Sequence, residues 1–508
     1  MTTAPDGDPP SPADSSDSAA GLARLIDERR AKAEALRAEG IDPFPSRFAG
    51  RNSINEVRAT GEDLEPGTER PGVVRVAGRL VARRGQGKMA FLDVEDRSGR
   101  IQVMATSNAI GEDQLERLVR LDLGDLVGVC GPLIRTRRGE LSIALQSYEI
   151  LAKSFRPPPD KHHGLKDPET RYRQRYADLI ASSEVRDVFI TRAKVIAGVR
   201  RFLDDRGFIE VETPVLQPIY GGAAARPFVT HHNTLDRDFF LRIATELYLK
   251  RCIVGGLEKV YELGKDFRNE GISFKHNPEF TMLETYEAYA DYSDVMDMLE
   301  AMVSDVAGLA AGTTTVRWRD HEIDLAPPWA RVTLRDGLLA TSRLDISVLG
   351  EAGSLRDAMR AKGYNAPDDA AWPKLVDELL TQALEPTLIQ PTFVHDYPLA
   401  LSPFAKSRPG QPDIVERFEA FCGGMEIANA YSELNDPDDQ RERLRAQAAA
   451  HAGGDDESQP MDEDYIAALE YGMPPTGGLG VGIDRLVMLL TGRDTIREVV
   501  LFPALRDT

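Results

Sequence analysis

The chain has 508 residues, enough for two or three domains, and its 42% hydrophobic and 28% charged residues are ordinary for a globular protein. A net charge of −20 argues against a protein that coats nucleic acid by bulk attraction. We expect neither a membrane span nor a secretory signal, and three widely spaced cysteines, which fit no disulfide framework or zinc site, indicate a reducing cytoplasm.

The N-terminal region divides into two segments. Residues 1–20 combine acidic residues with Pro, Ser and Ala, which predicts a disordered acidic tail. Residues 22–39 have the pattern of an amphipathic helix that Gly40 and Pro43 end, so residues 21–65 are assigned to a helical extension.

Short alternating strands begin near residue 73, and one helix at residues 113–121 interrupts them. Five short strands with an inserted helix predict a Greek-key barrel of the OB type, a fold that commonly binds oligonucleotides, at residues 66–152. Between Arg70 and Arg100, eight Lys/Arg residues face three Asp/Glu residues, a basic island that suits one docked polyanion or, alternatively, a solvated charged face. Three prolines at 157–159 indicate a stiff linker, placed at residues 153–182.

Residues 183–508 are expected to form one large domain of mixed α/β structure. It opens with a long helix over residues 185–205, a break at Gly207, and a strand before Pro214. Taken alone, this helix–strand unit is a generic pattern.

The run GKDFRNEGISFKHNPEFTMLE at residues 264–284 concentrates chemically useful side chains between turn signals. The guanidinium of Arg268 suits a carboxylate or phosphate, and Phe280 offers a face on which a purine can stack. With Glu270 and His276 beside them, these groups predict a site for a nucleotide next to a carboxylate.

A second run, GGLGVGIDRL at residues 477–486, is not a P-loop, because no Lys-Ser/Thr pair follows its glycines. Gly478, Gly480 and Gly482 alternate along a predicted strand that leads into a helix at Ile483, with Arg485 in its first turn. Strand glycines let a ligand approach the backbone closely.

These two runs resemble motifs 2 and 3 of the class II aminoacyl-tRNA synthetases, and the helix–strand unit resembles motif 1, which builds the dimer interface in that family. The resemblance implies an α+β fold, with an N-terminal OB-fold barrel and a catalytic domain built on an antiparallel sheet flanked by helices, in a homodimer. It implies catalytic roles for Arg268 and Arg485. The ATP-binding residues that it implies are Arg268, Glu270, His276, Phe280, Gly482 and Arg485.

Glu419 and Glu426 are seven positions apart, which fits two helical turns or well-placed strand positions, and both border apolar residues. Carboxylates beside a triphosphate commonly hold Mg²⁺, and the resemblance places magnesium ligands at these two positions, for two or more ions with ATP. By spacing alone, a surface pair of glutamates would be the better explanation.

The choice of amino acid is expected to depend on pocket charge. Glu246, Glu284 and Glu433 stand in site-like contexts, and buried carboxylates need a cation, so we predict a cationic substrate. The runs GGAAARPF, THHN, TELYLKR and AYSELNDP resemble the bacterial lysyl-tRNA synthetases, over residues 73–503. An aspartyl enzyme would need cations in this pocket and is disfavoured.

This closer resemblance implies ATP-dependent activation of L-lysine and its transfer to the 3′ end of tRNA(Lys). It implies that Glu433 and Tyr286 receive the ε-ammonium, that Glu246 and the backbone near Gly222 receive the α-amine, and that Arg268 and Asn429 hold the carboxylate. The complete set of lysine-binding residues is Gly222, Glu246, Arg268, Glu284, Tyr286, Asn429 and Glu433.

The resemblance implies that the barrel reads the anticodon through Phe91, Gln102 and Glu140, although Phe91 fits the barrel core equally well. Arg75, Arg79, Arg83 and Arg84 are candidates for phosphate contacts. Three other functions share features with this pattern. A lysyl ligase that modifies proteins usually lacks the barrel, a lipid-modifying form needs membrane helices, and a regulatory paralogue should have lost Arg268, Glu426 or Arg485.

Overall fold

The computed structural model describes residues 12–159, 165–452 and 459–506. The chain divides into two compact units, Met1–Leu165 and Lys166–Thr508, which are described separately. Within the described residues, no helix is both long enough and apolar enough to cross a membrane.

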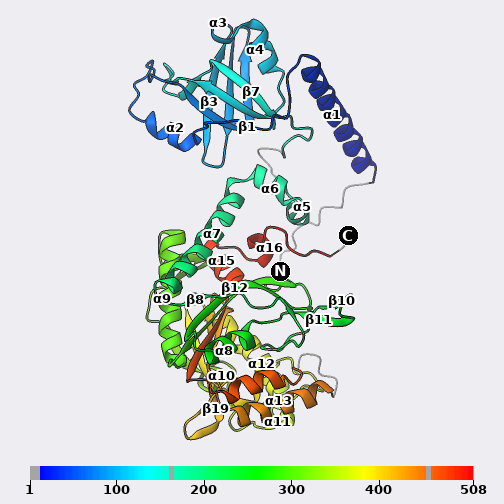
Figure 1. Ribbon diagram of the computed structural model, residues 1–508, viewed down its shortest axis with the longest axis vertical. Helices are drawn as coiled ribbons and strands as arrows, with labels where there is room; N and C mark the ends of the chain where they lie inside the picture. The colour runs from blue at the N-terminus through cyan, green and yellow to red at the C-terminus, as the bar shows by residue number, and fades with distance from the viewer. Residues whose placement is uncertain (1–11, 160–164, 453–458, 507–508) are drawn as a thin grey trace. The chain divides into compact units, whose positions relative to one another are not determined.

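The first unit contains the predicted OB-fold barrel, with a seven-stranded sheet in the order β5-β6-β3-β2-β1-β4-β7 (Figure 1). Its strands are β1 (Val74–Gln86), β2 (Met89–Glu95), β3 (Arg100–Thr106), β4 (Leu126–Gly131), β5 (Leu133–Arg135), β6 (Leu141–Ala144) and β7 (Ser147–Ala152). Its helices are α1 (Pro12–Ala38), α2 (Ile54–Thr60), α3 (Ser107–Ile110) and α4 (Glu112–Val119). Helix α4 stands where the inserted helix was expected. Alternate residues of β2 and β3 are buried, among them Leu92, Val94 and Val103, so each strand has one core face and one outer face.

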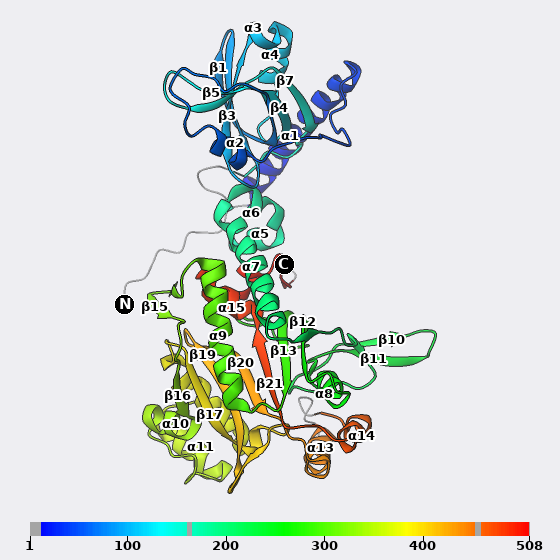
Figure 2. The same cartoon turned by 60° about the vertical axis from the view of Figure 1, so that its left-hand side comes forward.

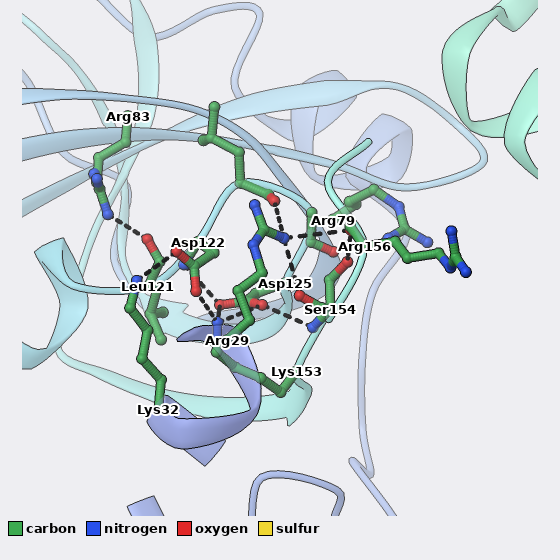
Figure 3. A network of polar contacts seen from close by, with 12 residues as sticks. Arg29, Lys32, Arg79, Arg83, Leu121, Asp122, Asp125, Lys153, Ser154 and Arg156 are labelled. Atoms are coloured by element: carbon green, nitrogen blue, oxygen red, sulfur yellow. Dashed lines mark hydrogen bonds and ion pairs between the residues drawn. The ribbon is translucent and has the colours of Figure 1, made fainter. Parts of the chain in front are cut away.

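Helix α1 is part of this unit, because a polar network ties it to the barrel (Figure 3). Arg29 is largely buried and donates hydrogen bonds to the backbone oxygens of Leu123, Ser154 and Arg156, at 3.2, 2.9 and 3.3 Å. Farther along the helix, Leu36 joins the barrel core. The helix therefore clamps the chain where it leaves the last strand of the barrel.

The start of α1 differs from the sequence-based expectation. The helix begins at Pro12, inside the segment that was expected to be a disordered tail through residue 20, and residues 1–11 lie outside the described residues. Proline suits the first helical position, because its missing N–H would have no partner there and its φ angle is already helical.

The second unit is built on a nine-stranded sheet in the order β16-β17-β19-β20-β21-β13-β12-β8, with β18 paired to β19. Its strands are β8 (Ile209–Glu210), β12 (Lys259–Phe267), β13 (Glu279–Ala288), β16 (Ala330–Thr333), β17 (Thr392–Pro398), β18 (Ser407–Arg408), β19 (Gln411–Cys422), β20 (Met425–Ser432) and β21 (Thr476–Gly482). The central strands β12, β13, β21, β20, β19 and β17 pair antiparallel, as predicted, whereas β8 and β16 add parallel pairs at the edges.

Two smaller sheets accompany this sheet, and their strands are β9 (Leu216–Gln217), β10 (Val229–His232), β11 (Arg237–Leu241), β14 (Thr315–Trp318) and β15 (His321–Asp324). The helices of the unit are α5 (Pro168–Arg173), α6 (Arg175–Ala181), α7 (Ser183–Asp204), α8 (Glu246–Val254), α9 (Tyr292–Ala311), α10 (Leu334–Ser342), α11 (Ala352–Ala361), α12 (Trp372–Leu379), α13 (Pro437–Ala452), α14 (Glu463–Glu470), α15 (Ile483–Thr491) and α16 (Ile496–Val499). Short helical turns are η1 (Leu380–Leu384), η2 (Glu385–Thr387) and η3 (Leu399–Leu401).

Helices α7 and α9 lie side by side against the sheet (Figure 2). Their apolar faces supply Val195, Val199, Leu299 and Val303 to the main core, which also takes in Leu486 of α15. Gly207 ends the α7 segment with a φ of 79°, a conformation that glycine adopts at little cost. The motif 1 helix therefore forms as predicted, but the strand after it shortens to the two residues of β8.

The expected linker at residues 153–182 also requires correction. Residues 160–164 of it lie outside the described residues, and α5 and α6 belong to the second unit. Arg175, which is fully buried, donates hydrogen bonds to the backbone oxygens of Arg497 (2.7 Å) and Leu501 (3.0 Å). These contacts dock the segment from residue 166 onward on the C-terminal end of the chain.

Candidate functional site

One cavity of about 540 Å³ in the second unit brings together most of the predicted site residues. Its lining includes Gly222, Glu246, Arg268, Glu270, His276, Phe280, Glu284, Tyr286, Glu426, Asn429, Gly482 and Arg485. Glu419 and Glu433 are absent from the lining and lie behind it. The sheet explains this gathering, because β13, β20 and β21 are neighbours and present alternate residues to the same side.

The predicted nucleotide end is built on the hairpin of β12 and β13. Arg268 begins the connecting loop, and its guanidinium carbon lies 5.0 Å from the centre of the Phe280 ring. Desolvation in the cavity, with the cationic Arg485 and Lys275 nearby, lowers the pKa of His276 to about 4, so its imidazole is neutral at pH 7. The loop therefore offers a fixed cation, a neutral hydrogen-bonding ring and an aromatic face, which together suit a nucleotide.

Arg485 follows the glycine strand in the first turn of α15, as the sequence predicted. Its Nη1 donates hydrogen bonds to the backbone oxygen of Glu426 (2.7 Å) and to Glu426 Oε2 (2.9 Å). Burial raises the pKa of Glu426, but Arg485 and Arg417 outweigh it, so the net shift is downward and the carboxylate stays charged.

Glu419 stands on β19, next to the strand of Glu426. Its Oε1 pairs with Arg417 at 2.5 Å, and its Oε2 accepts a hydrogen bond of 2.9 Å from the hydroxyl of Tyr397. Burial raises the pKa of Glu419 to about 7 although Arg417 opposes the shift. Within the described ranges, no group of three or more His, Cys, Asp or Glu residues could hold a metal. The two glutamates lie on adjacent strands, not two helical turns apart, and their oxygens suit a hard cation that also binds ligand oxygens.

The opposite end of the cavity is acidic. Glu284 Oε1 accepts a hydrogen bond from the backbone N–H of Thr245 (3.0 Å), and Tyr286 donates its hydroxyl proton to Glu284 Oε2 (3.2 Å). Burial, with Asp266 and Glu246 nearby, raises the pKa of Glu284 to about 8. The Glu284 carboxyl therefore holds its proton at pH 7 unless a cation binds beside it.

Two glycines make room for this acidic end. A Cβ atom on Gly478 would stand 1.9 Å from Glu433 Oε1 and 2.6 Å from Tyr286 Cε1, so only glycine fits there. Gly222 has a φ of 89°, and its N–H donates a 2.8 Å hydrogen bond to Gln459 Oε1. By contrast, a Cβ on Gly482 would meet its nearest atom at 3.7 Å, which is ordinary contact.

The sequence-based reasoning missed two residues of this region. Lys250 is fully buried, and its Nζ contacts the carboxylates of both Glu246 and Glu433. Its position four residues after Glu246 on α8 was a usable signal, because residues at that spacing share one helix face. Gln459 stands 237 positions from Gly222, and no local pattern marks it.

The proposed anticodon residues lie on the first unit. Phe91 and Gln102 alternate with the buried residues of β2 and β3, so both stand on the outer face of the barrel rather than in its core. Ser142, which pairs with Gln102 across β3 and β6, donates a 2.9 Å hydrogen bond to Gln102 Oε1, and Glu140 precedes it by two residues. Arg79 and Arg83 instead donate to the backbone oxygens of Gly124 and Leu121, which ties them to the fold (Figure 3).

Comparison with known proteins gives the family. Residues 167–506 match the family described as tRNA synthetases class II (D, K and N), and residues 74–151 match the OB-fold nucleic acid binding domain. The fold is thus that of a class II tRNA synthetase with an OB-fold domain.

The curated relatives narrow this class. A lysine–tRNA ligase of Roseiflexus sp. (strain RS-1) is 54% identical over 487 residues, covering 96% of this chain and 99% of the relative. A lysine–tRNA ligase of Moorella thermoacetica is 52% identical over 95% of this chain and 98% of the relative, and one of Chloroflexus aurantiacus is 51% identical over 94% and 98%. The chain belongs to the lysine–tRNA ligase family of the class II synthetases.

Proposed function

We propose that the cavity activates L-lysine with ATP and that the enzyme then transfers the lysyl group to the 3′ end of tRNA(Lys). In the first step a lysine carboxylate oxygen attacks the α-phosphorus of ATP, and pyrophosphate leaves. In the second step a hydroxyl of the terminal tRNA adenosine attacks the lysyl-adenylate carbonyl, and AMP leaves. One observation supports this function best: a single cavity has guanidinium groups and an aromatic face at one end and buried carboxyl groups at the other.

Lysine is proposed to lie with its two ammonium groups among the carboxylates. Glu246 and the backbone near Gly222 receive the α-amine, and Tyr286 and Glu433, with Glu284 beside them, receive the ε-ammonium. The closeness of Glu433 Oε1 to Gly478, which lines the cavity, supports its role although Glu433 itself stands behind the lining. Arg268 and Asn429 hold the carboxylate at the boundary with the nucleotide.

ATP is proposed to bind at the opposite end, with adenine on Phe280 and phosphates on Arg268 and Arg485. His276 and Glu270 contact the phosphates and the adenine amino group, and Gly482 brings the backbone close. Adenylate formation depends mainly on positioning and charge neutralisation, so Arg268 and Arg485 are the proposed catalytic residues and no protein base is required.

Glu419 and Glu426 are proposed to hold Mg²⁺, in two or more ions shared with ATP. Bound Mg²⁺ would neutralise charge on the leaving pyrophosphate. The pKa of about 7 at Glu419 supports this assignment, because a carboxyl with a raised pKa gains from a nearby cation. Arg417, which pairs with Glu419, holds that side chain in place.

The barrel is proposed to bind the anticodon through Phe91, Gln102 and Glu140. The outer-face position of Phe91 supports stacking on an unpaired base. We also propose the tail, helical extension, barrel, linker and catalytic domain as the functional divisions of the chain, with the catalytic part taken from residue 166 rather than 183.

We propose that the protein works as a homodimer in the cytoplasm. Large apolar side chains are exposed between residues 209 and 257, a concentration that supports a buried interface next to the motif 1 helix. They are Ile209, Val215, Leu216, Ile219, Val229, Leu235 and Leu257. Three free cysteines are consistent with a reducing compartment.

The test is ATP–pyrophosphate exchange with each of the twenty amino acids in turn, in the presence of Mg²⁺. Lysine alone should support rapid exchange, and comparable exchange with a neutral amino acid would contradict the acidic-pocket assignment. Glu433→Gln should lower exchange with lysine by roughly 100-fold, since one charge of a buried ionic cluster is removed. The KM for ATP in this variant is the internal control and should stay near the wild-type value.

A further inference from the structure

Lys250 is a buried cation that the proposed reaction does not use. Its side chain is fully inaccessible to solvent, and its Nζ lies 2.5 Å from Glu246 Oε1 and in contact with Glu433 Oε2. The Phe404 ring lies 4.9 Å from Nζ and the Tyr286 ring 6.0 Å, so aromatic faces complete the enclosure. A lone buried ammonium is costly, and here it is fully compensated.

Every element packed against Lys250 contributes to its electrostatic surroundings. Helix α8 supplies Glu246, the segment after β20 supplies Glu433, and α14 supplies Tyr465. Strand β13 adds Tyr286 and Glu284, and β20 adds Tyr431. An ionised Tyr431 would be repelled by Glu246 and Glu433, which raises its pKa. Burial lowers the pKa of Lys250, but Glu246 and Glu433 outweigh it, and the net pKa stands well above the usual value. The tyrosine pKa values are raised, so these hydroxyls stay neutral and Lys250 stays charged.

The carboxyl groups at the acidic end of the cavity outnumber the ammonium groups of a lysine substrate by one. Three carboxyl groups, those of Glu246, Glu284 and Glu433, surround the acidic end, whereas a lysine substrate brings two ammonium groups there. Lys250 supplies a third ammonium from the protein itself, so each of these three carboxyl groups has an ammonium to pair with when the proposed substrate is bound. Its cation lies outside the cavity lining and therefore does not take the place of the substrate.

The pairing of Glu433 leaves one oxygen for the substrate. Neither carboxyl oxygen of the buried Glu433 has a hydrogen-bond partner within the described part of the chain, but Oε2 forms an ion pair with Lys250 whereas Oε1 forms none there. A buried carboxylate oxygen usually has a partner. Oε1 points toward Gly478, which lines the cavity, so its missing partner would come from the cavity side.

We propose that Lys250 is a positioning residue for substrate lysine, which fixes the carboxyl groups of Glu246 and Glu433 in direction while leaving one oxygen of Glu433 for the incoming ammonium. The inference rests on the lysine site proposed above. It differs from a purely structural ion pair because it ties the affinity for lysine, and the pH at which lysine binds, to one side chain that the substrate does not touch.

The test is Lys250→Met in the full-length protein, a change that keeps the length of the side chain and removes its charge. Burial raises the pKa of Glu433 to about 8 although Lys250 opposes the shift, so without the ammonium Glu433 holds its proton to still higher pH and lysine binding requires more alkaline solution. We expect the KM for lysine in pyrophosphate exchange to rise roughly 100-fold at pH 7, while kcat at saturating lysine and the KM for ATP change little. The pH at which the KM for lysine reaches half its total change should increase by about one unit or more.

A matched control is Lys259→Met. Lys259 is also paired with a glutamate, Glu287 at 2.6 Å, but lies on β12 outside the cavity lining. This variant should keep the wild-type KM for lysine and the wild-type pH profile. Lys250→Arg retains the cation and should keep the pH midpoint even if its bulk raises the KM.

A folding defect in Lys250→Met is addressed by the double variant Lys250→Met/Glu433→Gln, which removes one positive and one negative charge together. Compared with Glu433→Gln alone, the double variant should show a higher KM for lysine, because the Glu246 carboxylate has lost the ammonium that holds it in place. A folded Lys250→Met protein with wild-type KM and pH profile, or a double variant with the same KM for lysine as Glu433→Gln, would refute the role of Lys250. Normal exchange in Glu433→Gln would instead refute the lysine site itself, so the two failures are distinguishable.

Discussion

Gly478 offers the sharpest single test of the acidic end, because the space beside its Cα is already filled. In Gly478→Ala the new methyl group would stand 1.9 Å from Glu433 Oε1 and 2.6 Å from Tyr286 Cε1. Neither neighbour can yield easily, since Glu433 is held by Lys250 and Tyr286 by Glu284. Overpacking of a filled interior costs about 1–3 kcal/mol, and a displaced Glu433 would add part of the roughly 3–5 kcal/mol of a broken buried ion pair.

We therefore expect Gly478→Ala to lower the free energy of unfolding by about 2–4 kcal/mol and to raise the KM for lysine strongly. Urea unfolding measures the first effect, and pyrophosphate exchange over a range of lysine concentrations measures the second. The KM for ATP should change much less, because Gly478 lies at the acidic end of the cavity.

The comparison variant is Gly480→Ala, two positions along the same strand. Its Cβ would find its nearest atoms at 3.8 Å, Asn429 O, and 3.9 Å, Met282 Sδ, so no atom of the protein has to move. Its free energy of unfolding should stay within about 0.5 kcal/mol of wild type, whatever its effect on bound ligands. If Gly478→Ala and wild type had equal stabilities and equal KM values for lysine, the contact of the new methyl group with Glu433 and Tyr286 would have no energetic consequence, and the predicted crowding at position 478 would be refuted.

Three further predictions follow from the same contacts. Gln459→Leu removes the acceptor for the Gly222 N–H, and we expect the KM for lysine in steady-state exchange kinetics to rise roughly tenfold. An unchanged KM would contradict a positioning role for Gln459. Phe91→Ala should lower kcat/KM for tRNA charging by about tenfold or more, the worth of one stacked base, while exchange without tRNA stays at its wild-type rate. Burial raises the pKa of Glu284 to about 8, so between its ordinary pKa and 8 the folded protein without lysine keeps a proton that the unfolded chain loses. The free energy of unfolding measured without lysine should therefore fall as the pH rises toward 8. Lysine binding at pH 7 should release protons, which calorimetry in buffers of different ionisation enthalpy detects, and binding without proton release would contradict the raised pKa of Glu284.

The sequence predicted correctly those elements of the site that depend on residues close together in the chain. The hairpin at residues 264–284 and the glycine strand before Arg485 form as predicted, because turn residues, strand alternation and a helix start all act over a few positions. Glu419 and Glu426 were ambiguous, since a spacing of seven fits both a helix and strand positions, and only the pairing of β19 with β20 resolves it.

Long-range contacts limited the other predictions. The second unit extends back to residue 166 because Arg175 finds backbone oxygens more than three hundred positions away, at Arg497 and Leu501. No periodicity within residues 153–182 carries that information. The same holds for Gln459, whose partner Gly222 is far away in the sequence.

Three carboxyl groups, those of Glu246, Glu284 and Glu433, predicted a cationic ligand from the sequence. Lys250, one helical turn after Glu246, adds a positive charge that this prediction did not include. Because that ammonium offsets one of the three carboxylates, the acidic end has room for two positive charges rather than three. Lysine carries two ammonium groups, so including the internal cation makes the prediction more specific: a neutral amino acid, with one ammonium, would leave a buried carboxylate without a partner, which is the costly state that discriminates against it.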